Sequence, residues 1–345
     1  MKTNLESRRS FIGKTAATTG LTAFGISGIS SEAQAQFYVS GKLPREVWIA
    51  TVSQNGLSTD NSAQMTDKIL ALLKRSLAYL PDIVCLPEVF ATSNIKPIKT
   101  LSEKVDSSAI ALKRFSAFAN ENKCYVICPV YTSQNGKIFN SAVLFDRKGE
   151  QMGEYHKIHL TEDEIEDGMK PGSLEPPVFE TDFGIIGIQI CFDLLWDDGW
   201  KSLKQKGAEI VFWPSAYAGG EVVNGKAWIN KYVVVSSTRK NTAKICEFTG
   251  EVVAQTGIWD PNLICAPVNL EKAFLHTWPF CQRFEEIRAK YGRKIRITNH
   301  HEEDWSVIES LSPDVLIKDI LREFNLKTFE QHVHDSELAQ KKARL

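Results

Sequence analysis

The segment from Gly184 to Ile190, which ends at Cys191, constrains the fold more than any other part of the chain. Nearly all of its residues are β-branched or small and apolar, which is typical of a strand buried on both faces of a parallel sheet. In α/β proteins, the ends of such strands are where reactive groups meet substrate. We therefore predict an α/β fold with the Cys191 thiol at the exit of a buried strand. A buried structural cysteine is the alternative for a single thiol.

Residues 1–35 have the pattern of an export leader. Arg8 and Arg9 precede an apolar stretch of small residues, and Ala-Gln-Ala at 33–35 has the form of a cleavage site. The segment resembles a twin-arginine signal peptide, which predicts a periplasmic protein. An uncleaved anchor is the alternative, although the apolar run is short for a membrane span.

The rest of the 345-residue chain is long enough for one large α/β domain with an extension. With 41 basic and 42 acidic residues, the net charge of −1 gives no electrostatic reason to expect nucleic acid or an anionic membrane as a partner. The seven cysteines are an odd number and do not predict a disulfide scaffold.

Hydrophobic periodicity before the central strand predicts crossover units followed by hairpins. We expect strands at 47–52, 83–86 and 124–128, separated by helices at 65–80 and 107–121, and then a hairpin of 139–145 with 152–157. This order predicts a sheet with both parallel and antiparallel strands.

The chain after Cys191 reads as a further series of short elements. We expect helices at 199–206 and 226–239, strands at 209–213, 243–248, 252–256 and 263–268, a pocket-lining loop at 214–224, and terminal helices at 316–326 and 329–338.

Two charged residues stand at strand ends. Glu88 follows a short apolar strand closed by Pro87, where desolvation would raise the carboxyl pKa as a general base requires. Lys157 follows another strand and precedes an acidic loop. Taken alone, each has a simpler interpretation: a helix cap or ion pair for Glu88, and a surface ion pair for Lys157.

The run from His300 to Asp304 contains residue types that bind metals. Contiguous side chains diverge, however, so a solvated loop is the better interpretation and we predict no metal site.

Four motifs in order resemble the nitrilase, or carbon–nitrogen hydrolase, superfamily. They are Leu86-Pro87-Glu88, the His-Lys-x-His setting of Lys157, Gly187-x-x-x-Cys191-x-Asp193, and Gly207-Ala208-Glu209-Ile210 with Pro214-Ser215-Ala216. The resemblance covers roughly residues 46–270. It implies a four-layer αββα sandwich over 44–270 and a C-terminal extension over 271–345, which in relatives packs across subunits. A homodimer or larger homo-oligomer is therefore expected.

The resemblance also implies a catalytic triad of Glu88, Lys157 and Cys191. The family has a second glutamate in the loop after the lysine. Glu164 fits this position best, and Glu162 and Glu166 remain alternatives.

The residues around the nucleophile indicate the type of substrate. Nitrile-hydrolysing members usually have Cys-Trp-Glu, whereas this chain has Cys-Phe-Asp, the pattern common among amidases and carbamoyl-amide hydrolases. We therefore expect a small-molecule linear amide or N-carbamoyl amine as substrate. A nitrilase, or a non-catalytic binding or assembly protein with this fold, are the alternatives.

The expected chemistry proceeds through a thioester and needs no metal or organic cofactor. Glu88 would accept the thiol proton, while Lys157 and the N–H of Phe192 would stabilise the oxyanion. Trp213 and Tyr217 are candidates for shaping the substrate pocket.

Overall fold

Two six-stranded sheets form the centre of the protein, which we describe from a computed structural model covering residues 42–98 and 100–345. The predicted leader lies outside these residues. The strands of the first sheet follow the order β12-β1-β2-β3-β4-β5. Their bounds are β1 (Glu46–Val52), β2 (Ile83–Cys85), β3 (Tyr125–Gln134), β4 (Lys137–Phe145), β5 (Gln151–His156) and β12 (Leu263–Asn269).

The first sheet combines crossovers with hairpins, which confirms the predicted order. Strands β1, β2 and β3 are parallel, and helices α2 (Ser62–Leu73) and α3 (Leu101–Asn122) connect them. Strands β4 and β5 then return as antiparallel hairpins. The short 3₁₀ segments η1 (Lys74–Tyr79) and η2 (Phe90–Thr92) extend the loops of this half.

The second sheet has the order β11-β10-β9-β8-β7-β6, and β7, the strand that leads to Cys191, is the second strand from one edge. Its strands are β6 (Val178–Thr181), β7 (Gly184–Ile188), β8 (Ile210–Ser215), β9 (Val233–Thr238), β10 (Lys244–Cys246) and β11 (Val252–Gln255). Strands β7, β8 and β9 are parallel, and helices α5 (Asp198–Gln205) and α6 (Glu221–Asn230) connect them.

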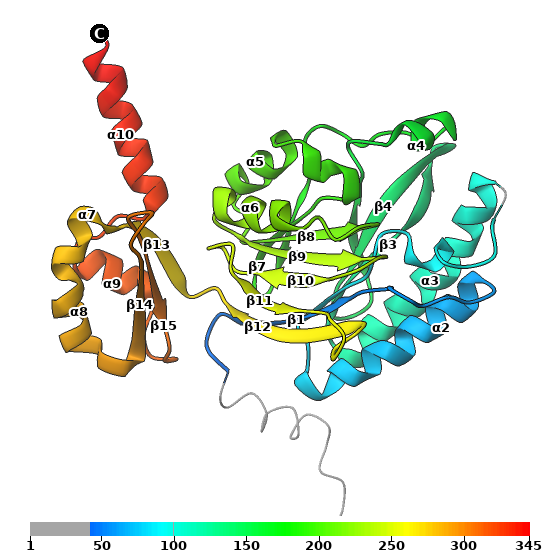
Figure 1. The fold of residues 1–345 in the computed structure, drawn as a ribbon, viewed down its shortest axis with the longest axis horizontal. Helices are drawn as coiled ribbons and strands as arrows, with labels where there is room; N and C mark the ends of the chain where they lie inside the picture. Colours follow the sequence, from blue (N-terminus) through cyan, green and yellow to red (C-terminus); the bar gives the residue numbers. More distant parts are fainter. Residues whose placement is uncertain (1–41, 99) are drawn as a thin grey trace, which may run out of the picture. The chain divides into compact units, whose positions relative to one another are not determined.

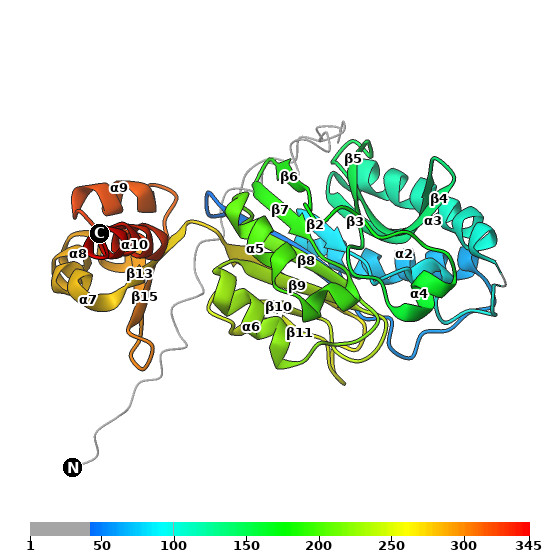
Figure 2. The same ribbon diagram turned by 90° about the horizontal axis from the view of Figure 1, so that it is seen from above.

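Alternating apolar side chains bury both faces of each sheet. In β1, Val47 and Ile49 belong to the cluster between the two sheets, where they join Ile186 and Phe212 of the second sheet. Val52 of the same strand instead packs in the cluster under α2 and α3. Helices α5 and α6 cover the outer face of the second sheet in the same way. These layers confirm the predicted αββα sandwich (Figures 1 and 2).

The helix predicted over 226–239 is wrong. Helix α6 ends at Asn230, Lys231 takes a left-handed conformation with φ 55°, and β9 covers Val233–Thr238. The β-branched sequence of this segment packs well on a pleated sheet and loses side-chain freedom in a helix. The loop predicted over 214–224 is also shorter, because β8 continues to Ser215 and α6 begins at Glu221.

A third, three-stranded sheet in the C-terminal part was not predicted. Its order is β13-β15-β14. Ala273 and Leu275 of the first strand pack in a hydrophobic core of the C-terminal elements, whereas Phe274 packs in a cluster with Phe248 of the sandwich. The elements are β13 (Lys272–His276), α7 (Thr277–Phe280), η4 (Cys281–Arg283), α8 (Phe284–Tyr291), η5 (Gly292–Lys294), β14 (Ile295–His300), β15 (Trp305–Ser310), α9 (Ile317–Glu323) and α10 (Phe329–Ala343). Helices α9 and α10 lie where helices were expected.

The histidine-rich run is part of this third sheet. His300 ends β14, and residues 301–304 form the turn to β15. Across residues 42–98 and 100–345, no group of three or more His, Cys, Asp or Glu side chains is arranged to hold a metal ion. None of the helices in the described part of the chain has the length and apolar character that a membrane span requires.

Candidate active site

Three charged or nucleophilic side chains follow the carboxyl ends of strands. Glu88 lies three residues after β2, Lys157 directly follows β5, and Cys191 follows β7 at the start of the 3₁₀ segment η3 (Cys191–Leu195). All three are almost completely buried, with exposures of 2%, 1% and 7%. The sandwich therefore brings together, inside the protein, residues that are 69 positions apart in the case of Glu88 and Lys157.

The backbone at Cys191 is in a conformation that few non-glycine residues adopt. Its φ is +45°, in the left-handed region, and such strain persists only where the surroundings hold it. The indole N–H of Trp213 donates to the Cys191 carbonyl at 3.0 Å. The Ser215 side chain and the Ala216 backbone form hydrogen bonds to the sulfur, yet burial raises the pKa of the thiol to about 12. The resting thiol is therefore neutral and needs a base.

Glu88 is a buried carboxylate that interacts with this thiol. Its Oε1 accepts hydrogen bonds from Asn140 Nδ2 at 2.9 Å and Lys157 Nζ at 3.1 Å. Burial alone would raise the carboxyl pKa, but the charges of Lys157 and Arg239 and the hydrogen bonds with Asn140 and Cys191 hold it below its ordinary value. The raised pKa predicted for Glu88 is therefore wrong. Its position at the end of a buried strand indicates desolvation, but the sequence does not show which charged partners the fold brings to it.

Lys157 is held as an ammonium by surrounding anions. Its Nζ donates to Glu164 Oε2 at 2.8 Å and to Glu164 Oε1 and Glu88 Oε1 at 3.1 Å. Burial opposes the charge, but the carboxylates of Glu88 and Glu164 raise the pKa of Lys157 above its ordinary value. A desolvated ammonium with a fixed position is suited to stabilising a developing oxyanion.

Of the three glutamates considered from the sequence, Glu164 is the one that contacts Lys157. It lies in the short helix α4 (Glu162–Glu166), where its Oε2 accepts from the backbone N–H of Thr161 at 2.8 Å in a capping box. The side chain is 14% exposed. Glu162 and Glu166 are exposed on the same helix.

Asn140 connects the two glutamates and was missed from the sequence. Its amide nitrogen donates to Glu88 Oε1 at 2.9 Å and to Glu164 Oε1 at 2.8 Å, and its own exposure is 1%. Its backbone carbonyl also accepts from Lys157 N at 2.8 Å. An asparagine inside the apolar strand β4 was a usable signal, because a buried amide requires hydrogen-bond partners.

Asp193 connects the turn that begins at Cys191 to the segment that carries Lys157. Its carboxylate, with an exposure of 0%, accepts from Tyr155 Oη at 2.6 Å, from the Ile190 N–H at 2.8 Å and from the His159 N–H at 2.7 Å. The motif identified Asp193, but sequence reasoning did not give it this connecting role.

The residues proposed to contact substrate occupy different environments. Phe192 is half-buried, and its ring meets Trp196 edge to face at 5.1 Å. Tyr217 is 37% exposed and meets Trp213 edge to face at 5.3 Å. Trp213 itself is fully buried, so we correct its predicted place in the pocket wall: its indole N–H instead donates to the Cys191 carbonyl.

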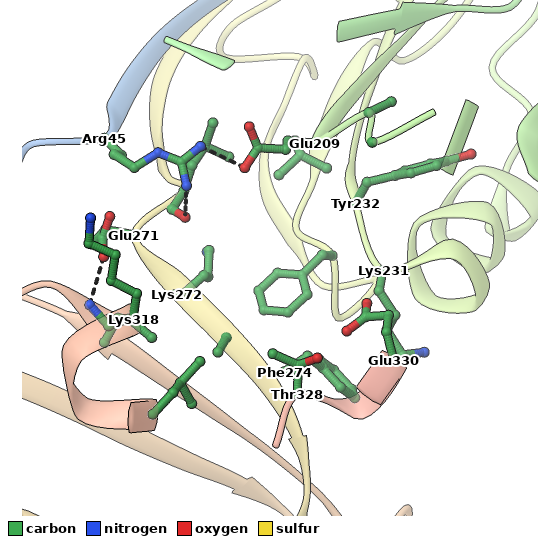
Figure 3. A pocket seen from close by; sticks show the side chains of 18 of the residues that line it. Arg45, Glu209, Lys231, Tyr232, Glu271, Lys272, Phe274, Lys318, Thr328 and Glu330 are labelled. Carbon is green, nitrogen blue, oxygen red and sulfur yellow. Dashed lines mark hydrogen bonds and ion pairs between the residues drawn. The ribbon is translucent and has the colours of Figure 1, made fainter. Parts of the chain in front are cut away.

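A cavity of about 550 Å³ lies away from this cluster, between the second sheet and the C-terminal elements. Figure 3 shows Arg45 paired with Glu209, at 2.6 Å. Lys204 is likewise paired with Glu330 at 3.0 Å. Because these charged groups satisfy one another, the cavity wall does not indicate a particular ligand.

Comparison with known proteins gives relatives with amidase names. Segments of the chain are 29% identical over 151 residues to "Deaminated glutathione amidase" of Synechocystis, covering 39% of this chain and 54% of the relative. The mouse protein of the same name is 30% identical over 192 residues, covering 50% of this chain and 57% of that one. The match thus spans about half the length of these relatives.

A solved structure with the same fold is that of Nit3 from Saccharomyces cerevisiae, described as a member of branch 10 of the nitrilase superfamily. It superimposes with a TM-score of 0.57 at 18% identity, covering 72% of this chain and 96% of that one.

The relatives correct the predicted location. They include proteins of mouse, fly and yeast, whose cells have no periplasm. The periplasmic location predicted from the leader is therefore wrong.

The family model described as "Carbon-nitrogen hydrolase" matches residues 49–273, which is well over half of the chain and includes both sheets of the sandwich and the cluster around Cys191. This protein belongs to the carbon-nitrogen hydrolase family.

Proposed function

We propose that the protein is a cysteine-dependent hydrolase of non-peptide carbon–nitrogen bonds, acting on a small linear amide or N-carbamoyl amine. The observation that supports this most strongly is the buried cluster in which Glu88 contacts Lys157 at 3.1 Å and also interacts with the thiol of Cys191. The amidase names of the relatives agree with an amide substrate.

Acylation begins with transfer of the Cys191 proton to the Glu88 carboxylate while sulfur attacks the carbonyl carbon. The carbonyl oxygen becomes an oxyanion, stabilised by the Lys157 ammonium and the backbone N–H of Phe192. When the intermediate collapses, the carbon–nitrogen bond breaks and the leaving nitrogen takes the proton from Glu88. Ammonia or an amine departs, and the acyl group remains on Cys191 as a thioester.

Deacylation repeats these roles with water as the nucleophile. Glu88 accepts a proton as water attacks the thioester, the same donors hold the oxyanion, and the thiolate leaves and recovers its proton from Glu88. The sum of the two half-reactions is amide plus water to acid plus ammonia or amine. Glu164 and Asn140 support the cycle through hydrogen bonds of 2.8–3.1 Å. Glu164 accepts from Lys157 and from Asn140, and Asn140 also donates to Glu88.

The test is ammonia release from a panel of linear amides, N-carbamoyl amines and nitriles, using wild type, Cys191→Ala and Cys265→Ala. Cys265 is a matched control, because burial raises its thiol pKa to about 12 as well. We expect wild type and Cys265→Ala to hydrolyse an amide or carbamoyl compound, and Cys191→Ala to lose turnover by several orders of magnitude. A folded Cys191→Ala variant that retains more than trace activity would sink the proposal.

A further inference from the structure

We propose that Arg239 is a positioning residue for the base: it acts on Glu88 Oε2, the oxygen left to accept the proton, and keeps that carboxylate ionised. This inference rests on the proposed function. Arg239 was missed from the sequence, where its segment was expected to be a helix.

The two oxygens of Glu88 differ in their surroundings. Oε1 accepts from Lys157 and Asn140, at 3.1 and 2.9 Å. Oε2 is buried, and no N–H or O–H group of the described residues donates to it. An oxygen that already accepts two donors is the poorer base, so the proton of the thiol goes to Oε2. Arg239 Nη2 lies 3.7 Å from this oxygen, close enough for charge attraction and too far for a hydrogen bond.

The backbone of Arg239 is fixed to both halves of the active site. Its N–H donates to the carbonyl of Ser215 at 2.8 Å, and the Ser215 side chain contacts the Cys191 sulfur. Two residues earlier, the Ser237 hydroxyl lies within hydrogen-bond distance of the carbonyls of Val52 (2.8 Å) and Cys85 (3.0 Å), at the ends of β1 and β2. Arg239 therefore follows a strand end that is tied to the strand carrying Glu88.

The guanidinium is anchored to the turn that carries the base. Arg239 Nη1 donates to Ser93 Oγ at 2.9 Å, and Ser93 Oγ donates to the carbonyl of Val89 at 2.9 Å. Val89, next to Glu88, has a left-handed φ of 40°. This chain of contacts holds the cation beside Oε2 in a fixed orientation, although the Arg239 side chain is 30% exposed.

The charged and titratable groups around Glu88 show why a second cation matters. These groups come from five different elements: Lys157 follows β5, Arg239 follows β9, Cys191 follows β7, Glu164 lies on α4 and Tyr131 lies on β3. Burial and the charges of Glu88 and Glu164 raise the pKa of the Tyr131 phenol. Lys157 is shared between two carboxylates. Arg239 supplies the further positive charge that offsets the burial of Glu88.

The test is the pH profile of Arg239→Gln, with Arg239→Met as a second neutral replacement in case the first does not fold. Loss of the cation raises the pKa of Glu88, so the acid limb of kcat/KM moves to higher pH, by about one unit for an opposite charge at this distance. Lys240→Gln is the matched control. It removes the adjacent, exposed cation and is expected to leave the limb unchanged.

The pH dependence of the rate at which iodoacetamide alkylates Cys191 gives a second, independent measurement of the Glu88 pKa, because that reaction also needs Glu88 as base. If no amide is hydrolysed, the proposed function fails, while the alkylation profile still tests Arg239. A folded, neutral Arg239 variant whose acid limb stays at the wild-type pH in both measurements would overturn the inference. A variant whose plateau falls without a shift of the limb would also overturn it, since that is the signature of a purely structural role.

Discussion

Glu164 and its neighbours Glu162 and Glu166 carry the same functional group on one short helix, yet only one of the three side chains reaches Lys157. The capping box with Thr161 turns the Glu164 carboxylate back toward the helix N-terminus, where Lys157 Nζ donates to Oε2 at 2.8 Å. The other two side chains are exposed. Position along the helix, rather than residue type, separates their roles.

Replacing Glu164 by Gln is expected to lower kcat by at least about 100-fold, because the lysine loses one of the two carboxylates that orient it. Glu162→Gln and Glu166→Gln are the matched controls and should change kcat less than about twofold, as exposed replacements away from the site do. Steady-state kinetics on one amide compares all three. If the Glu164→Gln variant is active and the Glu166→Gln variant is inactive, the role predicted for Glu164 belongs to Glu166 instead.

The site residues that could be predicted from the sequence are those that lie in short motifs. Glu88, Lys157, Cys191 and Glu164 all follow recognisable strand ends or loops. Asn140 escaped because its partners are 52 and 24 residues away and its neighbours are apolar. The lowered pKa of Glu88 could not be predicted for the same reason, because it depends on the charges of Lys157 and Arg239, which follow β5 and β9.

Among the elements, the close contact between β7 and α5 fixes the strand that leads to Cys191. A Cβ added at Gly187 would lie 2.7 Å from Leu203 Cδ2, where the helix packs on the strand. The glycine in the family motif therefore has a packing reason: it allows α5 to approach the sheet.

Gly187→Ala is expected to destabilise the protein by about 1–3 kcal/mol through overpacking. Gly225→Ala is the contrasting variant, because Gly225 lies inside α6 and an added Cβ meets nothing within 4 Å. That change should stabilise by up to about 1 kcal/mol through helix propensity. Denaturant unfolding measures both, and equal effects of the two replacements would refute this account of the β7 and α5 contact.

Hydrophobic periodicity predicted most elements of the sandwich, but it failed where a helix and a strand follow one another with almost no loop between them. Helix α6 and strand β9 are separated by only Lys231 and Tyr232, without Gly or Pro to mark the break, so they read as one helix. The third sheet was missed because its strands have five or six residues and mix polar with apolar positions. Tertiary pairing, rather than local propensity, defines these strands.

At the scale of the whole molecule, Lys231 joins the sandwich to the C-terminal elements. Its ammonium lies 3.8 Å from the ring centre of Trp305, 4.8 Å from that of Phe274 and 5.5 Å from that of Phe329. Beyond this contact, helix α10 is exposed along most of its length, with Leu338 at 52%. A 15-residue helix with so little packing is marginal on its own.

The extension over 271–345 is therefore proposed to associate with a second copy of the chain through α10. Light scattering of the chain is expected to give an oligomer, and a chain that ends after Leu326, before α10, should shift toward monomer. Val333→Lys with Leu338→Lys is a milder variant, because both side chains are exposed and apolar in the single chain. An oligomer that survives both changes would place the interface elsewhere.

The acyl group on Cys191 is the central claim, and mass spectrometry of the acid-quenched reaction tests it most directly. With an amide that the wild-type chain hydrolyses, the intact mass should rise by the acyl group of that amide, and peptide mapping should place the group on the peptide containing Cys191. The adduct should be absent from Cys191→Ala and present in Cys265→Ala. An active chain whose acyl group maps to any other residue, or a Cys191→Ala variant that still forms the adduct, would contradict the account.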